Sequence, residues 1–374
     1  MVMSPPAATA PKAKKIDAFF QYMFDNSASD LHLSSGKPPM VRVHGELEAV
    51  ASLPPLEHAD LFQLLQEIAP PLKWEQFTST GDVDFGYELP GVARFRCNYF
   101  NQRSGCAAVF RQIPTKVLTA EQLGLPPVLL KAAMLKKGLV LVTGPTGSGK
   151  STTLAAMIDH ANKNRRDHIL TVEDPIEFVH QSQGCMVNHR EVGLHTESFA
   201  NALKGALRED PDIILVGEMR DLETIRLAVE AAATGHLVFG TLHTTNAAKT
   251  VDRIIEVFPP EEQNQIRNTL STSLKCVVAQ NLFKRSDIKG RCAALEILVC
   301  NAAIGNLIRE NKTFQIPSAM QLGKKQGMQT LDDAILDLLN VKKWISAEEA
   351  YDKCIDKTRF QQYVKMSPED MMFA

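Results

Sequence analysis

The 374-residue sequence predicts a mixed α/β protein with a small α+β domain followed by a larger α/β domain whose C-terminal part is helical. Three observations lead to this fold class. Short alternating segments bounded by Gly and Pro fill the first third of the chain. Apolar strand-like runs then alternate with helical patterns, which is typical of a parallel sheet covered by helices. The final third, from about Glu261, is predicted to be mostly helical.

The first domain is expected over residues 16–113, after a disordered Ala/Pro-rich and basic tail at residues 1–15. A helical pattern begins at Ile16 and runs to Phe24. A second helix is expected around Leu61 to Ile68. The predicted strands cover residues 30–33, 40–43, 82–87, 93–99 and 107–111.

A linker rich in Pro and Gly is expected over residues 114–130, and the second domain over residues 131–365, with a tail at 366–374. Ser346 and Glu349 have the spacing of a capping box at a helix start. The predicted strands of this domain cover residues 138–143, 168–173, 213–217 and 237–242.

Composition excludes several function classes. The formal net charge is −2, so no global basic field attracts nucleic acid or an acidic membrane. Seven cysteines are scattered without a C-x-x-C pair, which favours free thiols in a reducing cytoplasm over a zinc or redox site. The start resembles no signal peptide, and no apolar run approaches a membrane span, so any membrane contact is expected to come through partners.

A phosphate-binding loop is the strongest motif in the chain. It fits G-x-x-x-x-G-K-[ST] and lies between a strand-like run and a helical pattern, the context that distinguishes it from a chance glycine-rich turn. Backbone N–H groups of such a loop surround phosphates, Lys150 would reach the β- and γ-phosphates, and the Ser151 hydroxyl would hold Mg²⁺. The sequence therefore predicts ATP and Mg²⁺ as ligands. The loop residues are Gly144, Pro145, Thr146, Gly147, Ser148, Gly149, Lys150, Ser151 and Thr152.

Carboxylates follow two of the predicted strands. Glu218 ends the run that begins at Asp212 and is placed to orient the attacking water or assist at Mg²⁺. Glu173, Asp174 and Glu177 form a cluster whose mutual repulsion a metal-bound phosphate would relieve. The alternative interpretations are an acid that merely ends a strand and a solvated acidic turn.

A histidine stands at each end of the predicted strand 237–242. His243 is at its carboxyl end, where parallel sheets place their ligands, and could sense the γ-phosphate or a neighbouring subunit. His236 is at the amino end and is a further candidate for nucleotide contact. For both, the alternative is a packing or surface role.

Four stretches resemble the motifs of the secretion/pilus ATPase superfamily. In chain order, the phosphate-binding loop resembles its Walker A motif, the Glu173 cluster its Asp box, the run that ends at Glu218 its Walker B motif, and the strand with His236 and His243 its His box. Further segments are similar to the PilT family of type IV pilus retraction ATPases, and the resemblance covers about residues 16 to 345. These segments are residues 29–33 (Ser-Asp-Leu-His-Leu), 36–39 (Gly-Lys-Pro-Pro), 208–221, and 327–332 (Gly-Met-Gln-Thr-Leu-Asp).

The resemblance implies a PAS-like N-terminal domain that presents arginines to the nucleotide of a RecA-like ATPase domain. Arg96 and Arg111 match those positions, and a guanidinium supplied there neutralises phosphoryl charge. From the residues alone, a solvated sheet face is the alternative. The family pattern also places Glu173, Glu177, Glu218 and His243 in catalysis, Asp174 and His236 at the nucleotide, and Glu177 with Ser151 at the metal.

The implied function is a hexameric ATPase motor that powers pilus retraction at the cytoplasmic face of the inner membrane. Its implied partners are an inner-membrane platform protein resembling PilC and a second pilus ATPase, without nucleic acid. Alternatives are an assembly or type II secretion ATPase of the same superfamily and a non-hydrolytic accessory subunit, although Lys150 and Glu218 are both present.

One departure from the family pattern lies near the C-terminus. The family usually has Ala-Ile-Arg-Asn-Leu-Ile-Arg-Glu, whereas this chain has Gly305 at the first arginine position of residues 303–310. Glycine lowers helix propensity by roughly 1 kcal/mol and removes a charge. Arg309 is expected on a solvated or partner-binding face.

Overall fold

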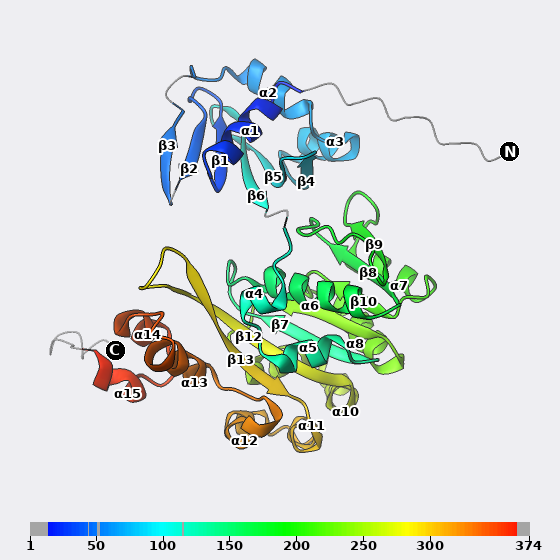
Figure 1. Ribbon diagram of the computed structural model, residues 1–374. Coiled ribbons are helices and arrows are strands. Elements are labelled where there is room, and N and C mark those ends of the chain that lie inside the picture. The colour runs from blue at the N-terminus through cyan, green and yellow to red at the C-terminus, as the bar shows by residue number, and fades with distance from the viewer. Residues whose placement is uncertain (1–13, 44, 51–52, 114–115, 365–374) are drawn as a thin grey trace. The chain divides into compact units, whose positions relative to one another are not determined.

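The computed structural model describes residues 14–43, 45–50, 53–113 and 116–364, which form two compact units (Figure 1). The first unit holds the described residues up to Lys116 together with Pro175–Phe178. The second holds Val117–Asp174 and the described residues from Val179 onward. Most of the predicted N-terminal tail, two residues of the linker and the predicted C-terminal tail lie outside the described residues.

The first unit contains a six-stranded sheet in the order β3-β2-β1-β6-β5-β4, in which every neighbouring pair is antiparallel. Its strands are β1 (Asp30–Ser34), β2 (Met40–Val43), β3 (Glu46–Ala49), β4 (Asp82–Leu89), β5 (Ala93–Gln102) and β6 (Gly105–Ile113). Its helices are α1 (Asp17–Asp25), α2 (His58–Gln66) and α3 (Pro71–Thr80).

Alternation along the strands gives this sheet one apolar and one polar face. On β5, Phe95, Cys97 and Tyr99 are buried in one cluster with Phe20 of α1 and Leu61 of α2. The helices therefore cover the apolar face. Both predicted helices and all five predicted strands are present, whereas β3 and α3 were not expected because β3 is exposed and α3 is largely polar.

The second unit contains a seven-stranded sheet in the order β13-β12-β7-β11-β10-β8-β9. All neighbours are parallel except β12 and β13, which are antiparallel. The strands are β7 (Gly138–Thr143), β8 (His168–Glu173), β9 (Met186–Glu191), β10 (Ile213–Val216), β11 (Leu237–Leu242), β12 (Leu274–Lys284) and β13 (Arg291–Val299).

Helices cover both faces of this sheet, as the buried runs on its strands require. On β7, Val140 and Val142 pack in the cluster that contains residues of α5 and α6, whereas Leu139 and Leu141 pack with residues of α7 to α12. The helices are α4 (Ala120–Leu123), α5 (Pro127–Ala133), α6 (Lys150–Asn164), α7 (Phe199–Ala206), α8 (Leu222–Thr234), α9 (Ala247–Glu256), α10 (Pro260–Ser273), α11 (Ala302–Arg309) and α12 (Ile316–Leu322).

The prediction of a mostly helical final third is wrong between Leu274 and Val299, where β12 and β13 extend the sheet. Residues 276–279 of β12 are all buried, and periodicity alone does not separate such a run from a buried helix. Beyond β13 the chain is helical as expected. The last helices are α13 (Leu331–Leu336), α14 (Ala347–Lys353) and α15 (Lys357–Phe360), with a π-helical turn at Asp337–Val341.

Ser346 caps α14 by accepting a hydrogen bond from Glu349 N at 3.2 Å. Glu349 Oε1 instead accepts from Lys284 N and Lys353 Nζ, so only half of the predicted capping box is present. None of the seven cysteines, all of which lie in the described residues, forms a disulfide. In the described parts of the chain, no helix has the length and hydropathy needed to cross a membrane.

Candidate functional site

The predicted phosphate-binding loop connects β7 to α6 at the carboxyl edge of the parallel sheet. Gly149 caps the helix with φ +86°, and Gly144 has φ +141°, conformations that side chains with a Cβ rarely adopt. The helix begins at Lys150, so its first N–H groups and its positive dipole end point into the loop.

Polar groups within the loop fit a phosphate ligand. Lys150 Nζ donates to Gly144 O at 2.9 Å and Pro145 O at 3.0 Å, which holds the ammonium over the loop. Ser148 Oγ is buried and makes no hydrogen bond to any residue that the structure describes. A buried hydroxyl without a partner is costly, and a bound phosphate oxygen would satisfy it.

Gln280 of β12 supports the loop from below, and sequence analysis did not identify it. Its Nε2 donates to Ser148 O at 2.7 Å, and its Oε1 accepts from Thr153 Oγ1 of α6 at 2.7 Å. The packing is close: a Cβ at Gly144 would lie 2.3 Å from Gln280 O, and one at Gly149 would lie 2.8 Å from Gln280 Nε2. The two glycines are therefore also required by the approach of β12. No sequence motif marks Gln280.

Two cavities adjoin these elements. One of about 740 Å³ is lined by Pro145 to Ser148 and by residues of β12, β13 and α14 that include Lys284, Arg291 and Lys353. Glu349 is the one carboxylate in this lining, so its charge balance favours an anionic ligand. The other, of about 580 Å³, is lined by residues that follow β10, by the end of β11 and the residues after it, and by α9, and it includes Glu218, Arg220, His243 and Arg253.

Glu218, directly beyond β10, lies between two cationic or proton-donating groups. Its Oε1 accepts from His243 Nε2 at 2.7 Å and from Arg220 Nε at 2.5 Å. Burial raises the pKa of Glu218, but the hydrogen bonds from Arg220 and His243 outweigh burial and hold the pKa below its ordinary value. Glu218 is therefore a carboxylate at neutral pH, able to accept a proton and to orient water. Arg220 belongs to the segment 208–221, within which its own role is not evident from the sequence.

Glu173 ends β8, the strand beside β10, so it lies at the same edge of the sheet as Glu218. Its Oε1 is 3.8 Å from His189 Nδ1 of β9. Asp174 follows it and is exposed. Adjacent parallel strands thus place Glu173 and Glu218 at the same edge of the sheet.

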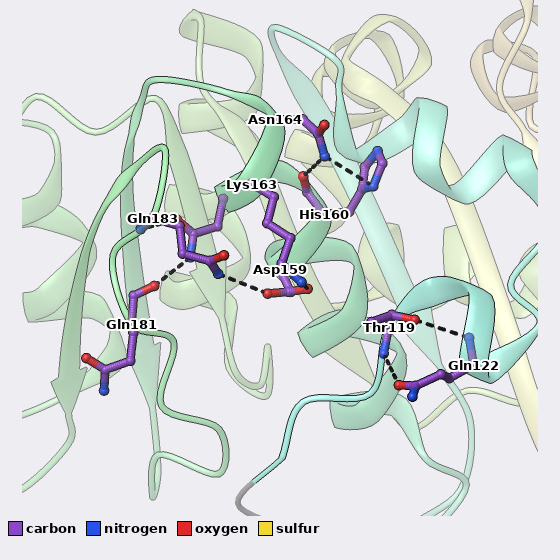
Figure 2. Close-up of polar contacts among 9 residues, drawn as sticks. Thr119, Gln122, Asp159, His160, Lys163, Asn164, Gln181 and Gln183 are labelled. Carbon is purple, nitrogen blue, oxygen red and sulfur yellow. Dashed lines mark hydrogen bonds and ion pairs between the residues drawn. The ribbon is translucent and has the colours of Figure 1, made fainter.

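The segment after this carboxylate cluster is fastened to the helix of the phosphate-binding loop. Figure 2 shows Gln183 pointing toward Asp159 of α6, with Nε2 to Oδ1 at 3.2 Å. Lys163 donates to Asp159 Oδ2 at 2.6 Å from one helical turn away. Gln181 O accepts from Asn162 Nδ2 at 2.8 Å. These bonds hold residues 181–183 against α6.

His236 lies at the opposite edge of the sheet, immediately before β11, where its Nδ1 is 3.0 Å from Ala231 O. The six residues of β11 separate it from His243, a span of roughly 20 Å. The structure does not bring His236 to the phosphate-binding loop of its own chain. A role at nucleotide would require a neighbouring subunit.

Arg96 and Arg111 are cross-strand neighbours on β5 and β6 of the first unit. Like charges in this position repel, and each is compensated by an aspartate. Arg111 Nε is 2.8 Å from Asp30 Oδ1, and Arg96 Nε is 3.7 Å from Asp84 Oδ1. Burial raises the pKa of Asp30, but hydrogen bonds from Ser29 and Arg111 hold it below its ordinary value.

The remaining predicted metal ligands are divided between the units. Ser151 lies in the first turn of α6 in the second unit, whereas Glu177 groups with the first unit. The prediction that Arg96, Arg111 and Glu177 act at the nucleotide, and that Glu177 joins Ser151 at Mg²⁺, therefore stays a prediction.

Comparison with known proteins shows the family to which the chain belongs. The family described as Type II/IV secretion system protein matches residues 7–348. The "Type IV pilus retractation ATPase PilT" of Pseudomonas aeruginosa is 57% identical over 326 residues, which cover 87% of this chain and 94% of that protein. The "Twitching motility protein" of Neisseria gonorrhoeae is 54% identical over 312 residues, 83% of each chain. The crystal structure of the pilus retraction motor PilT with bound ADP superposes with a TM-score of 0.85 at 43% identity, covering 94% of this chain and 100% of that one.

Proposed function

Since the chain belongs to the PilT family of pilus retraction ATPases within the Type II/IV secretion system proteins, it is an ATP hydrolase, and we propose that it acts as a homohexameric motor for type IV pili. The motor would work at the cytoplasmic face of the inner membrane against a platform protein of the PilC kind and beside a second pilus ATPase. The observation that carries the proposal is the carboxylate of Glu218, held by Arg220 and His243 at the sheet edge that bears the phosphate-binding loop.

The chain's own groups divide the work of hydrolysis. The loop and Lys150 bind phosphate, Gln280 keeps the loop in place, and Ser148 Oγ offers a hydrogen bond inside it. Glu218 orients water and accepts its proton, and His243 holds the carboxylate in position while reporting on the site to the next subunit. ATP supplies the phosphoanhydride bond whose cleavage provides the free energy.

Metal and arginine roles complete the proposal. The Ser151 hydroxyl and the carboxylate of Glu177 would hold Mg²⁺, whose oxygen-ligand preference both groups satisfy. Arg96 and Arg111 would serve the nucleotide of a neighbouring subunit, which explains why two arginines stand opposite each other on a polar sheet face. Each now pairs with an aspartate, which a phosphate group of the nucleotide would replace as its partner.

ATPase assays on purified protein test the site. Lys150→Ala should weaken nucleotide binding because a phosphate-pairing cation is lost. Glu218→Gln should keep binding and stop turnover because a neutral amide is a poor base. Glu48→Gln, on an exposed carboxylate of β3, is a control that should leave turnover unchanged. Full turnover by Glu218→Gln would contradict the assigned role.

Pilus imaging after deletion in the host separates retraction from assembly. Excess surface pili with lost twitching are expected from loss of a retraction motor. Bald cells would instead identify an assembly ATPase, and unchanged pili with an inactive purified protein would favour an accessory subunit.

Subunit mixing tests the hexamer and its shared sites. Inactive Lys150→Ala chains mixed with inactive Arg111→Ala chains should regain part of the activity, because some sites receive one intact half from each chain. A stable active monomer, or no rescue in rings shown to be mixed, would contradict sites built between subunits.

A further inference from the structure

Glu296 of β13 is a buried carboxylate that the hydrolytic site does not use. Its Oε1 accepts from Ala247 N at 2.6 Å, and the Leu331 N–H lowers the pKa of the same carboxylate. Ala247 is the first residue of α9 and Leu331 the first of α13. One side chain therefore interacts with the first N–H of two helices whose first residues are 84 positions apart in sequence.

The position of Glu296 in the sheet is equally specific. It pairs with Ala279 of β12, which pairs with Thr143 of β7, which pairs with Leu242 of β11. Thr143 immediately precedes the phosphate-binding loop, and Leu242 immediately precedes His243. Glu296 thus lies in the cross-strand row from which both catalytic loops begin.

The His243 loop is folded onto the helix start that Glu296 holds. Thr250 Oγ1 of α9 donates to Asn246 O at 2.7 Å and is 2.7 Å from Thr244 Oγ1. Asn246 caps the helix by accepting from Lys249 N at 2.8 Å. A shift of the first turn of α9 therefore moves His243 and its bond to Glu218.

The other end of the arrangement continues into the C-terminal helices. Gln329 forms an antiparallel bridge with Ile297 beside Glu296, with N–O distances of 2.8 and 3.0 Å. Asp332, next to Leu331, accepts from Ile355 N at 2.8 Å and from Asp356 N at 3.0 Å. These bonds connect residues 327–332, one of the segments that resemble the PilT family, with the loop between α14 and α15.

We propose that Glu296 is a positioning residue for ATP hydrolysis, which fixes the start of α9 relative to the start of α13 and thereby holds His243 against Glu218. The proposal rests on the ATPase activity and does not depend on the role in pilus retraction. Burial raises the pKa of Glu296 above its ordinary value, and the two backbone N–H groups counteract burial only in part.

The test is steady-state ATPase kinetics on the full chain with Glu296→Gln, which preserves shape but presents one acceptor oxygen to two N–H donors. We expect kcat to fall roughly tenfold, since one buried N–H of a helix start loses its partner. KM for ATP should stay within about twofold, because the phosphate-binding loop keeps its own contacts. In a His243→Ala background the same substitution should have no further effect on kcat, whereas a general structural role would lower both backgrounds equally.

A backbone variant tests the contact from the other side. Ala247→Pro, at a first helical position that favours proline after an extended Asn246, removes the N–H that donates to Glu296 and adds ring atoms at a buried position. It should reproduce the kcat loss of Glu296→Gln, and Ala302→Pro at the first position of α11 is the matched control that should leave kcat unchanged. Unchanged kcat in folded Glu296→Gln, or equal losses with and without His243, would overturn the proposal. If Glu296→Gln does not fold, the same comparison is made with Ala247→Pro in the parent and in the His243→Ala background. Equal losses of kcat in the two backgrounds would then overturn the proposal.

Discussion

Replacing Gln280 by methionine should weaken both the second unit and its hold on nucleotide. The methionine side chain is of similar length, so the change removes the two 2.7 Å hydrogen bonds of the carboxamide without opening a large cavity. Ser148 O is left as a buried carbonyl without this donor, which costs about 1 to 3 kcal/mol, and the lost bond to Thr153 adds about 1 kcal/mol.

The expected result is a fall of about 2 to 4 kcal/mol in the free energy of unfolding, measured by urea denaturation. The Kd for a fluorescent ADP should also rise roughly tenfold, because the loop is no longer held to β12 and must be ordered on binding. Thr153→Val should be partly non-additive with Gln280→Met, since the two changes remove a shared bond.

Gln329→Met is the matched control, because Gln329 also donates one side-chain hydrogen bond to a backbone carbonyl, that of Leu295 at 2.9 Å. It should lower stability and leave the ADP Kd unchanged. The reasoning is refuted if Gln280→Met binds ADP as tightly as the parent protein, or if the control weakens ADP binding equally.

Three further predictions concern other parts of the chain. Gly305→Ala should lower the free energy of unfolding by roughly 1 kcal/mol in urea despite the gain in helix propensity, because its Cβ would lie 2.7 Å from Ser271 O; a more stable variant would contradict the close approach of α10 and α11. Burial and the neighbouring His189 lower the pKa of His180 from 6.5 to about 4, so the unfolded chain binds the proton more readily and stability present above pH 6.5 is lost as the pH falls toward 4. The slope should reach about 1.4 kcal/mol per pH unit and diminish in His180→Gln, and identical pH profiles would speak against this. Arg309→Ala, which loses a 3.2 Å bond to Ser271 Oγ, should keep ATPase activity within about twofold and impair retraction in cells; normal retraction would exclude a partner contact, and lost ATPase activity in a folded hexamer would assign the residue to hydrolysis.

The close approach of α10 and α11 also accounts for the departure at position 305. Gly305 is buried, and a Cβ there would meet a backbone oxygen, which cannot rotate away as a side chain would. An arginine at this position would require the two helices to separate. The glycine is therefore a packing feature of this chain.

Local patterns in the sequence determined the parallel strands and the functional groups at their ends. Buried runs followed by Gly or a carboxylate were sufficient to predict β7, β8, β10 and β11 and to place the loop, Glu173, Glu218 and His243 at one edge of a sheet. This succeeds because parallel strands with buried faces are continuous apolar segments, and their carboxyl ends must meet.

Tertiary structure alone decided which residues support those functional groups. β12 joins β7 from more than 130 residues away, and only that pairing places Gln280 under the loop and Glu296 between two helix starts. Neither residue carries a local signal, because a buried amide or carboxylate is stable only where distant backbone groups converge on it. Arg220 is a similar case, because its role comes from its contact with Glu218 and not from the motif that contains it. Sequence specifies which groups can bind phosphate, and long-range strand pairing specifies which groups hold them in place.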